Sequence, residues 1–329
     1  MLKVVSIGGF GHSVFVFDDM TGMEEAKIVA LAPAFEGEDI SFFTGHDLCK
    51  GVKEYPDYGK MIEEVKPDVA VISTRLDIIP QVIIDAANAG CHIIAEKPLA
   101  LDKDNLEKVR KAIKDNNVRL TAMLSMRSEP EFIAAKNVYE SGVIGEAVLV
   151  NGRKSYKYGK RPDWFGDKDK YGGTIGWVGI HAFDFINFVT GLGFGKTAAM
   201  QGNFSHPERP ACEDNCAIIA ELSNGGNCTV SVDLFRPQSA GTHGDDWIRV
   251  VGTKGVIEAR GSDNTCTVII DGEKPEPVEL PAKSKMFKDF LLSLCGDENA
   301  PTYQEESFML TDVCLRADDS AQNSTVVDC

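Results

Sequence analysis

The chain contains 329 residues, of which 50 are Asp or Glu and 34 are Lys or Arg, so its formal net charge at pH 7 is −16. At about 150 residues per domain, this length predicts roughly two domains. Hydrophobic residues make up 43% and charged residues 26%, which is typical of a globular protein and excludes a disordered or fibrous chain. The negative charge disfavours binding to nucleic acids and to anionic membranes, so we expect neither as a partner.

The apolar run near the N-terminus, from Lys3 to Phe17, is broken by glycines and followed by two aspartates. This pattern indicates a strand and the start of a helix rather than a signal peptide, and we expect a cytoplasmic protein. The nine cysteines are scattered and form no Cys-x-x-Cys, which favours reduced thiols. A polar loop contains possible metal ligands, but we predict no metal site there. These residues are His206, Cys212, Glu213, Asp214 and Cys216.

The first 125 residues alternate between strand and helix patterns. Strands are predicted at 2–7, 27–32, 68–74, 91–95 and 119–124, and helices at 58–65, 79–89 and 102–116, the last capped by Asp102 or Asp104. Strands that alternate with helices imply a parallel sheet with right-handed crossovers. We therefore predict a doubly wound α/β (Rossmann) domain over residues 1–124.

The pattern then changes. Helices are predicted at 130–141, 177–189, 285–294 and 304–319, and strands at 147–156, 217–222, 228–235, 247–251, 256–260 and 267–271. Glycine-rich turns join four of these strands into two hairpins. We therefore predict that residues 125–329 form an α+β domain with a large, mostly antiparallel sheet.

A glycine-rich run directly follows the first predicted strand. Glycines here let the backbone approach a pyrophosphate at the N-terminus of the next helix. The run comprises Gly8, Gly9, Phe10, Gly11, His12 and Ser13. Its spacing departs from Gly-x-Gly-x-x-Gly, so a simple tight turn is an equally strong interpretation.

Two later motifs also carry chemistry. Glu96-Lys97-Pro98 lies at the carboxyl end of a predicted parallel strand, where open α/β sheets bind ligands. Gly172-Gly173 precedes a helix in which His181 and Asp184 share one face. Considered separately, the first could be a solvated strand end, and the histidine could be an ordinary core residue.

In this order the motifs resemble those of the Gfo/Idh/MocA family of NAD(P)-dependent oxidoreductases, a resemblance that spans nearly the whole chain. Arg127, the Gly142-x-x-Gly145 pair and the segment 319–321 (Asp-Ser-Ala) also lie where the family places them. The resemblance implies a C-terminal helix at about 303–323 that packs back on the first domain. It also implies a homodimer or homotetramer formed through the sheet of the second domain.

The resemblance assigns catalysis to Lys97 and His181. It implies that the cofactor is held by Gly8, Gly9, Phe10, Gly11, His12, Ser13, Ser73, Thr74, Arg75, Glu96, Lys97 and Pro98. Candidates for substrate binding are Arg127, Lys154, Tyr156, Trp164, Trp177 and Asp184.

The chain departs from the family at two positions. Pro33 replaces the acid that usually binds the adenosine ribose, and Trp177 replaces an aspartate that several relatives carry four residues before the histidine. No Lys or Arg lies between Ala32 and Thr44, and three acids are present there, Glu36, Glu38 and Asp39. These acids repel a 2′-phosphate, so we expect NAD rather than NADP.

The basic, aromatic run from Arg153 to Trp164 is unusual in an acidic chain. It is interpreted either as a substrate lid, since aromatic rings stack on sugars and cations hold hydroxyls or a carboxylate, or as a strand edge that continues into a loop.

The predicted function is hydride transfer between NAD(P) and a carbinol of a sugar, cyclitol or related polyol. Two alternatives remain open. One is an NAD-using glycosidase with no net redox change, and the other is a non-catalytic ligand-binding or regulatory member of the same fold.

Overall fold

The computed structural model describes residues 1–297 and 300–328, and within them the chain divides into two compact units. Unit 1 contains residues 1–123 and 285–311, and unit 2 contains residues 124–284 and 312–329. The sequence assigned all of 125–329 to the second domain, whereas 285–311 belongs to unit 1. The reason is the apolar face of one helix in this segment, whose Met286, Phe287, Phe290 and Leu291 join the unit 1 core.

Unit 1 is built on a six-stranded sheet of order β3-β2-β1-β4-β5-β6, in which all pairs are parallel. Its strands are β1 (Leu2–Ile7), β2 (Ala26–Ala32), β3 (Lys53–Glu54), β4 (Val69–Ile72), β5 (His92–Ala95) and β6 (Leu120–Ala122). The central strands are buried on both faces, which explains their continuous apolar sequences. The predicted parallel sheet is therefore confirmed.

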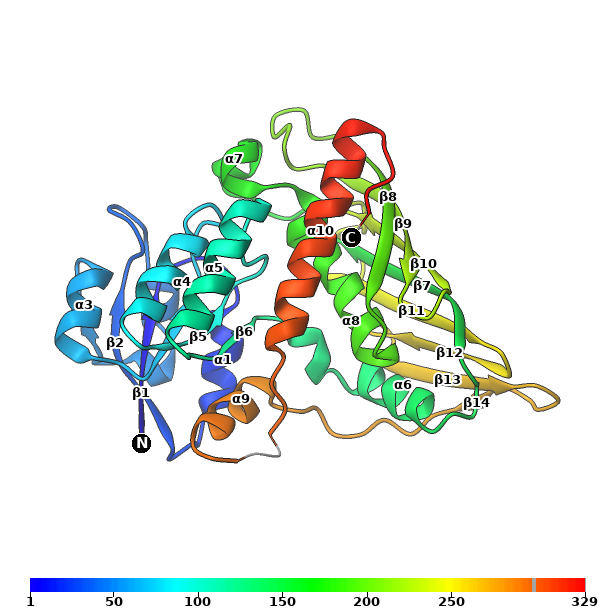
Figure 1. Cartoon of the computed structure of the whole chain (residues 1–329), viewed down its shortest axis with the longest axis horizontal. Helices are drawn as coiled ribbons and strands as arrows, with labels where there is room; N and C mark the ends of the chain where they lie inside the picture. Colours follow the sequence, from blue (N-terminus) through cyan, green and yellow to red (C-terminus); the bar gives the residue numbers. More distant parts are fainter. Residues whose placement is uncertain (298–299, 329) are drawn as a thin grey trace. The chain divides into compact units, whose positions relative to one another are not determined.

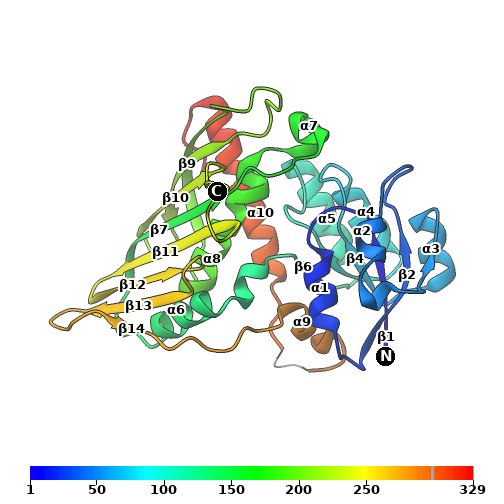
Figure 2. The same ribbon diagram turned by 180° about the vertical axis from the view of Figure 1, so that it is seen from behind.

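Helices cover both faces of this sheet. They are α1 (Ser13–Met20), α2 (Ser41–Thr44), α3 (Tyr58–Val65), α4 (Ile79–Asn88), α5 (Lys103–Asp115) and α9 (Met286–Leu294), with a 3-10 turn η1 (Asp47–Cys49). Figures 1 and 2 show α4 and α5 on one face and α1 and α9 on the other. The side chain of Asp102 accepts a hydrogen bond from the Asn105 N–H at 2.8 Å, so this residue caps α5 as predicted.

Unit 2 contains an eight-stranded sheet of order β14-β13-β12-β11-β7-β10-β9-β8. The strands are β7 (Ala147–Tyr156), β8 (Phe194–Gly202), β9 (Asn215–Leu222), β10 (Asn227–Asp233), β11 (Gly244–Gly252), β12 (Gly255–Arg260), β13 (Thr265–Ile270) and β14 (Glu276–Pro277). Only the β7–β10 pair is parallel among these strands, which confirms the mostly antiparallel sheet. Both predicted hairpins, β9–β10 and β11–β12, are present.

The helical elements of unit 2 include η2 (Ser125–Ser128), α6 (Pro130–Glu140), η3 (Asp163–Gly166), α7 (Lys168–Tyr171), the π-helical η4 (Ile175–Gly179) and α8 (Ile180–Thr190). Helices α6 and α8 pack on one face of the sheet, while Figure 2 shows the other face without a helix in the described chain. Every residue of α8 is buried, as its apolar sequence predicts. The last helix, α10 (Gln304–Asn323), begins in unit 1 and ends in unit 2.

None of the helices in the described part of the chain combines the length and the apolar character that crossing a membrane requires. The short outer strands β3 and β14 have no counterpart in the sequence prediction, because two residues carry no periodic signal.

Candidate active site

The carboxyl ends of β1, β4 and β5 bring the cofactor candidates to one edge of the unit 1 sheet. The chain runs outward in opposite directions from the neighbouring strands β1 and β4, and open α/β sheets bind ligands at such a switch point. Gly8 follows β1, Ser73 follows β4, and Glu96 follows β5. The parallel register therefore gathers residues that are far apart in the sequence.

Ser73 holds the glycine-rich loop against β4. Its carbonyl oxygen accepts a hydrogen bond from the Phe10 N–H at 3.1 Å, and its hydroxyl donates to the Phe10 carbonyl oxygen at 2.6 Å. Both hydrogen bonds use the backbone of Phe10, so they leave the side chain at this position unspecified. The phenylalanine that breaks the glycine spacing is thus compatible with a closely held loop.

Glu96 holds the same loop from the side of β5. One carboxylate oxygen accepts the His12 N–H at 2.7 Å and lies 2.8 Å from Nδ1 of the His12 ring. Burial by itself would raise the pKa of this fully buried carboxyl. The charge and hydrogen bonds of His12, together with the charge of Lys97, outweigh burial and lower the pKa. Glu96 is therefore an ionised anchor of the loop.

Gly11 is required by this arrangement. Its φ is +111°, and a Cβ atom there would lie 2.3 Å from a carboxylate oxygen of Glu96 and 2.6 Å from the Ser73 hydroxyl. The sequence explained this glycine by the approach of a pyrophosphate, whereas the structure explains it by contact with the protein itself.

Lys97 lies just beyond the carboxyl end of β5 and is 1% exposed. Its ammonium nitrogen is 4.0 Å from the nearer Glu96 carboxylate oxygen, and the Lys97–Pro98 peptide bond is cis. An ammonium group held beside a carboxylate at low solvation is an arrangement that can stabilise negative charge on a substrate oxygen.

The residues of this edge fit a dinucleotide. The loop leads into α1, and the Ser13 hydroxyl at the first turn is buried without a hydrogen-bond partner among the described residues. Helix N-termini favour phosphate groups, so the first turn of α1 suits a pyrophosphate. Cofactor-facing roles for Pro98 and for the individual loop residues remain predictions.

The loop after β2 places an acidic residue, Glu38, near the carboxyl ends of the same strands. Glu38 accepts hydrogen bonds from the Ala34 N–H at 2.7 Å and from the Thr74 hydroxyl at 2.6 Å. Arg75 lies over the ring of Phe35, but both its Nε and Nη2 atoms donate to the carboxylate of Asp77. The positive charge of Arg75 is therefore compensated within the protein.

The catalytic candidate of unit 2, His181, lies in the first turn of α8 and is 2% exposed. Trp177 precedes it by four residues in η4 and is 7% exposed, with its ring 6.1 Å from that of Phe165. The indole is thus part of an aromatic wall next to the helix that carries His181.

Arg127 and Asp184 form a buried ion pair. The Arg127 Nε lies 2.6 Å from a carboxylate oxygen of Asp184, and its Nη2 donates to Asn187 at 3.0 Å. Both charged residues are at most 3% exposed. Their charges therefore compensate each other and hold α8 against η2, and the assignment of these two residues to substrate binding remains a prediction.

Lys154 is also committed to a protein partner. Its ammonium group donates to Asp246 at 2.6 Å and lies over the Tyr156 ring, 4.8 Å from the centroid. Lys154 and Tyr156 belong to β7, which lies between β11 and β10 in the middle of the sheet. Residues 153–156 therefore form neither a mobile lid nor an edge strand, and for them both interpretations of the sequence are wrong. A lid role remains open only for the loop from Lys157 onward.

Beyond β7 the chain forms an aromatic cluster. Trp164, Phe165 and Tyr171 lie together, with ring centroids 4.5 Å apart for Trp164–Phe165 and 4.2 Å apart for Phe165–Tyr171. The adjoining Gly173 has φ of +110°, and a Cβ there would lie 2.7 Å from the Lys168 ammonium group. The positive φ favours glycine at position 173, whereas the Lys168 ammonium group at the end of its flexible side chain can move away.

Two residues of this region were not singled out by the sequence. Asp246 is the partner of Lys154, and Arg161 lies over the rings of Tyr158 and Phe165. Arg161 belongs to the basic, aromatic run from Arg153 to Trp164, whose composition indicated a functional segment. The sequence did not show which of the cations in this run mattered.

The polar loop at 206–216 is organised by Asp214. This carboxylate accepts hydrogen bonds from the N–H groups of Phe204 and Ser205 and lies 3.1 Å from the His206 ring. Within residues 1–297 and 300–328, no group of three or more Cys, His, Asp or Glu residues could hold a metal ion.

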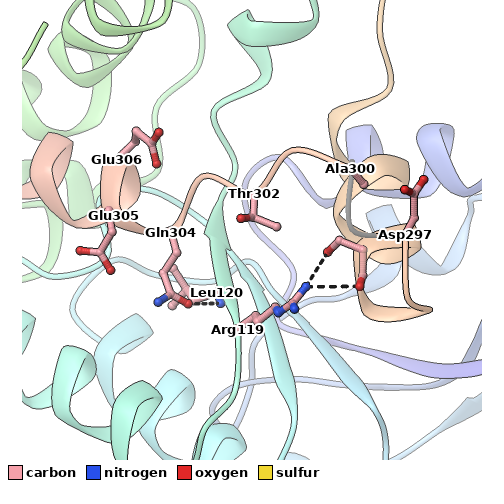
Figure 3. A pocket seen from close by; sticks show the side chains of 9 residues that line it. Arg119, Leu120, Asp297, Ala300, Thr302, Gln304, Glu305 and Glu306 are labelled. Atoms are coloured by element: carbon pink, nitrogen blue, oxygen red, sulfur yellow. Dashed lines mark hydrogen bonds between the residues drawn. The ribbon is translucent and has the colours of Figure 1, made fainter. Parts of the chain in front are cut away.

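A separate pocket of about 710 Å³ lies at the opposite ends of the strands of the unit 1 sheet (Figure 3). Arg119 directly precedes β6, so the pocket lies at the amino ends of the strands, away from the glycine-rich loop. The Arg119 guanidinium donates to Ser293, and the Leu120 N–H donates to the side chain of Gln304. Other lining residues include Asp297, Glu305 and Glu306, an acidic set that disfavours phosphates.

Two family models match the chain. Residues 47–124 match the oxidoreductase family with an NAD-binding Rossmann fold, and residues 132–258 match the Gfo/Idh/MocA C-terminal domain. The first match covers much of unit 1 and the second covers the centre of unit 2.

Individual relatives agree with these models. A Thermotoga maritima protein described as an oxidoreductase has a structure similar to this chain, with a TM-score of 0.94 and 33% identity over 100% of both chains. Inositol 2-dehydrogenase of Salmonella typhimurium is 26% identical over 63% of this chain and 58% of that protein. Levoglucosan dehydrogenase of Pseudarthrobacter phenanthrenivorans is 29% identical over 54% of this chain and 46% of that enzyme.

The alignments with these two dehydrogenases thus span about half of their lengths, so their substrates do not transfer directly to this protein. The parallel sheet, the residues gathered at its carboxyl edge and the two family matches lead to one assignment. The chain belongs to the Gfo/Idh/MocA family of NAD(P)-dependent oxidoreductases.

Proposed function

We propose that this protein is an NAD-dependent dehydrogenase that oxidises a carbinol of a sugar, cyclitol or related polyol. The observation that carries the proposal is the position of Lys97, buried beside the ionised Glu96 at the carboxyl end of β5 and next to the glycine-rich loop. The distant similarity to inositol and levoglucosan dehydrogenases supports a polyol substrate.

The roles of the chain's own residues follow from their chemistry. His181 takes the hydroxyl proton as general base, a role suited to imidazole, whose ordinary pKa is about 6.5. Lys97 hydrogen-bonds a substrate oxygen and stabilises the negative charge that develops on it. A bound nicotinamide would supply the acceptor for the hydride that leaves the substrate. Arg127 and Asp184 position α8.

We propose NAD rather than NADP because of the loop after β2. The carboxylate of Glu38 is held beside Thr74, where it repels a 2′-phosphate, and the charge of Arg75 is already compensated by Asp77. A structure of levoglucosan dehydrogenase with NADH has the same fold, with a TM-score of 0.83.

We further propose that a second copy of the chain packs on the helix-free face of the unit 2 sheet. The middle of this face over β8, β9 and β10 is uncharged, and there Met200 is 80% exposed and Ile219 58% exposed. The outward residues of this middle part are Ala198, Met200, Ala217, Ile219, Thr229 and Ser231. The charged residues Lys196, Glu221 and Asp233 lie toward the ends of the same strands. Exposed apolar patches of this kind mark protein–protein contacts.

The test combines cofactor binding with a substrate screen. We expect calorimetry to show tighter binding of NADH than of NADPH, and we expect a panel of sugars and cyclitols with NAD⁺ to contain compounds that yield NADH. NADH binding without oxidation of any polyol would favour a non-catalytic role. Glycoside cleavage that depends on NAD⁺ without net NADH formation would favour the redox-neutral glycosidase.

A further inference from the structure

Arg161 carries two buried nitrogen donors that the protein does not use. Its Nε and Nη2 atoms are buried and have no hydrogen-bond acceptor among the described residues. The guanidinium carbon lies 5.7 Å from the centroid of the Tyr158 ring and 5.5 Å from that of Phe165. A buried, charged donor without an acceptor is costly, and such groups in folded proteins usually have a ligand or a partner.

The two nitrogens form the side of the guanidinium that matches a carboxylate. Two other arginines of this chain show the match directly. Nε and Nη2 of Arg75 donate to both carboxylate oxygens of Asp77, and Nε and Nη2 of Arg260 donate to both oxygens of Asp245. This planar, bidentate geometry distinguishes arginine from lysine and favours carboxylates.

The backbone of Arg161 is held in place by another arginine. The Arg209 Nη2 donates to the carbonyl oxygen of Arg161 at 3.1 Å and also lies 3.2 Å from the carboxylate of Asp163. The carboxylate nearest to Arg161 in the sequence is therefore engaged by Arg209, and its side chain is fully exposed. Arg161 is fixed at its backbone, while its Nε and Nη2 atoms are not engaged by an acceptor among the described residues.

Charges of both signs lie around Arg161. On the side of Tyr171 and Cys212 the anion is Glu213, which lies 3.5 Å from the Lys168 ammonium group. Cations prevail on the side of His243. The pKa of His243 is lowered, first by burial and then by the charges of Arg161, Lys157 and Lys154, against one opposing charge from Asp246. Asp246 already pairs with Lys154. On the His243 side of Arg161 the cations therefore outnumber the anions, which favours an anionic ligand.

This place adjoins the helix that carries the proposed general base. Arg161 packs on Phe165, and the Phe165 ring contacts Trp177 in a T-shaped arrangement. Trp177 precedes His181 by four residues. A substrate whose reacting hydroxyl reaches His181 can therefore extend past two aromatic rings toward Arg161.

We propose that Arg161 binds a carboxylate of the substrate, so that the preferred substrates are sugar acids rather than neutral polyols. This inference rests on the proposed dehydrogenase function and adds the charge of the substrate. Tyr158 and Phe165 flank the cation and limit its access to water, which strengthens a charge-assisted hydrogen bond.

The experiment uses matched pairs of compounds that differ in the acid group: D-glucuronate with D-glucose, D-galacturonate with D-galactose, and D-gluconate with sorbitol. Each is tested with NAD⁺ on wild type, Arg161→Gln, Arg161→Lys and the control Arg110→Gln. Arg110 also lies over an aromatic ring, that of Phe308, but in unit 1.

We expect wild type to oxidise an acid in preference to its neutral partner. Arg161→Gln should raise KM for the acid by about tenfold to a hundredfold, since a charge-assisted hydrogen bond is lost, and leave the neutral partner nearly unaffected. Arg161→Lys, which keeps the charge and loses the fork, should recover only part of the affinity. Arg110→Gln should behave as wild type.

Equal use of both members of a pair, or equal effects of Arg161→Gln on both, would overturn the inference and leave the dehydrogenase function intact. Selection of glucose 6-phosphate through Arg161 would also overturn the carboxylate assignment. If no compound is oxidised, the proposed dehydrogenase function fails. The Tm of the protein in the presence of each acid then tests separately whether Arg161 binds a carboxylate. Acids that raise the Tm of wild type but not of Arg161→Gln support it, whereas equal shifts in a folded variant exclude it.

Discussion

The ring of His12 and the carboxylate of Glu96 are joined across 84 residues of sequence, with Nδ1 2.8 Å from Oε2 and the His12 N–H donating to the same oxygen at 2.7 Å. This pair connects the glycine-rich loop to the strand end that carries Lys97. Because substitution of Gly11 would collide with Glu96, a Gly11 variant tests this contact as much as it tests a pyrophosphate.

Substitution of Glu96 therefore gives a better test of the loop. We expect Glu96→Ala to weaken NADH binding by about tenfold, because the loop loses an anchor and must be ordered when the cofactor binds. Glu96→Gln keeps an acceptor for the His12 N–H and should lose less. Calorimetric titration measures both, with Glu64→Ala on the surface of α3 as the control. Undiminished affinity in folded Glu96→Ala would show that the loop is stable without its anchor.

Lys97→Met tests the role of the positive charge of Lys97, since methionine has nearly the same side-chain volume. If Lys97 stabilises the developing negative charge, kcat should fall by about a hundredfold or more while NADH affinity stays nearly unchanged. The exposed Lys108 of α5 provides the control, Lys108→Met. Steady-state kinetics on the substrate identified in the screen measures the effect, and turnover near that of wild type would make Lys97 a structural residue.

Because Arg127 and Asp184 form a buried ion pair, we expect the effects of substituting them on the free energy of unfolding to be strongly coupled. Arg127→Met alone leaves a buried carboxylate without its cation, and we expect the free energy of unfolding to fall by about 3–5 kcal/mol. In the double variant Arg127→Met/Asp184→Leu no buried charge is left over, so its loss should be clearly smaller than the sum of the single losses. Denaturant titration of the three variants measures the coupling. Additive losses would contradict a direct pair.

Asp245 predicts a pH dependence of stability. The hydrogen bond from Arg260 lowers the pKa of this carboxyl, burial opposes the effect, and Ser262 and Arg153 lower it further, from its ordinary 3.8 to about 2. A lowered folded-state pKa means that the ionised carboxylate stabilises the fold above about pH 4 and that this stability is lost as the pH falls toward 2.

The contribution of Asp245 at neutral pH is about 2 kcal/mol, from a difference of nearly two pKa units. Asp245→Asn should therefore be less stable than wild type at neutral pH, and the difference should shrink as the pH falls below about 4. Asp263→Asn, which removes a more exposed partner of Arg260, is the control. A difference that stays constant with pH would show that packing rather than charge is responsible.

The helix-free face of the unit 2 sheet predicts an oligomer. Ile219→Glu places a charge in the centre of its apolar surface, and we expect light scattering to show the chain shifting toward monomer with little loss of Tm. Phe204→Glu, at a more exposed apolar residue outside β8, β9 and β10, should leave the mass unchanged. A monomeric wild type would exclude the second copy as the partner of this face.

Much of the fold was predictable because its signals are local. The limits of β1 and β7 agree with the predicted 2–7 and 147–156, since a strand end coincides with a change of polarity or with glycine. Asp102 was one of the two caps that the sequence offered for α5, and the structure shows that it caps the helix. Parallel pairing in unit 1 followed from alternation alone, which places Gly8, Ser73 and Glu96 at one edge.

The sequence by itself thus determined the fold class, the cofactor edge and the family resemblance, whereas the tertiary structure decided which charges compensate one another. Lys154 meets Asp246 across 92 residues and Arg127 meets Asp184 across 57, while the fork of Arg161 finds no protein acceptor in the described chain. The return of α9 to the unit 1 core was decided in the same way. Periodicity and caps depend on neighbours within a turn or two, but charge pairing depends on the register and packing of distant elements, which no local pattern contains.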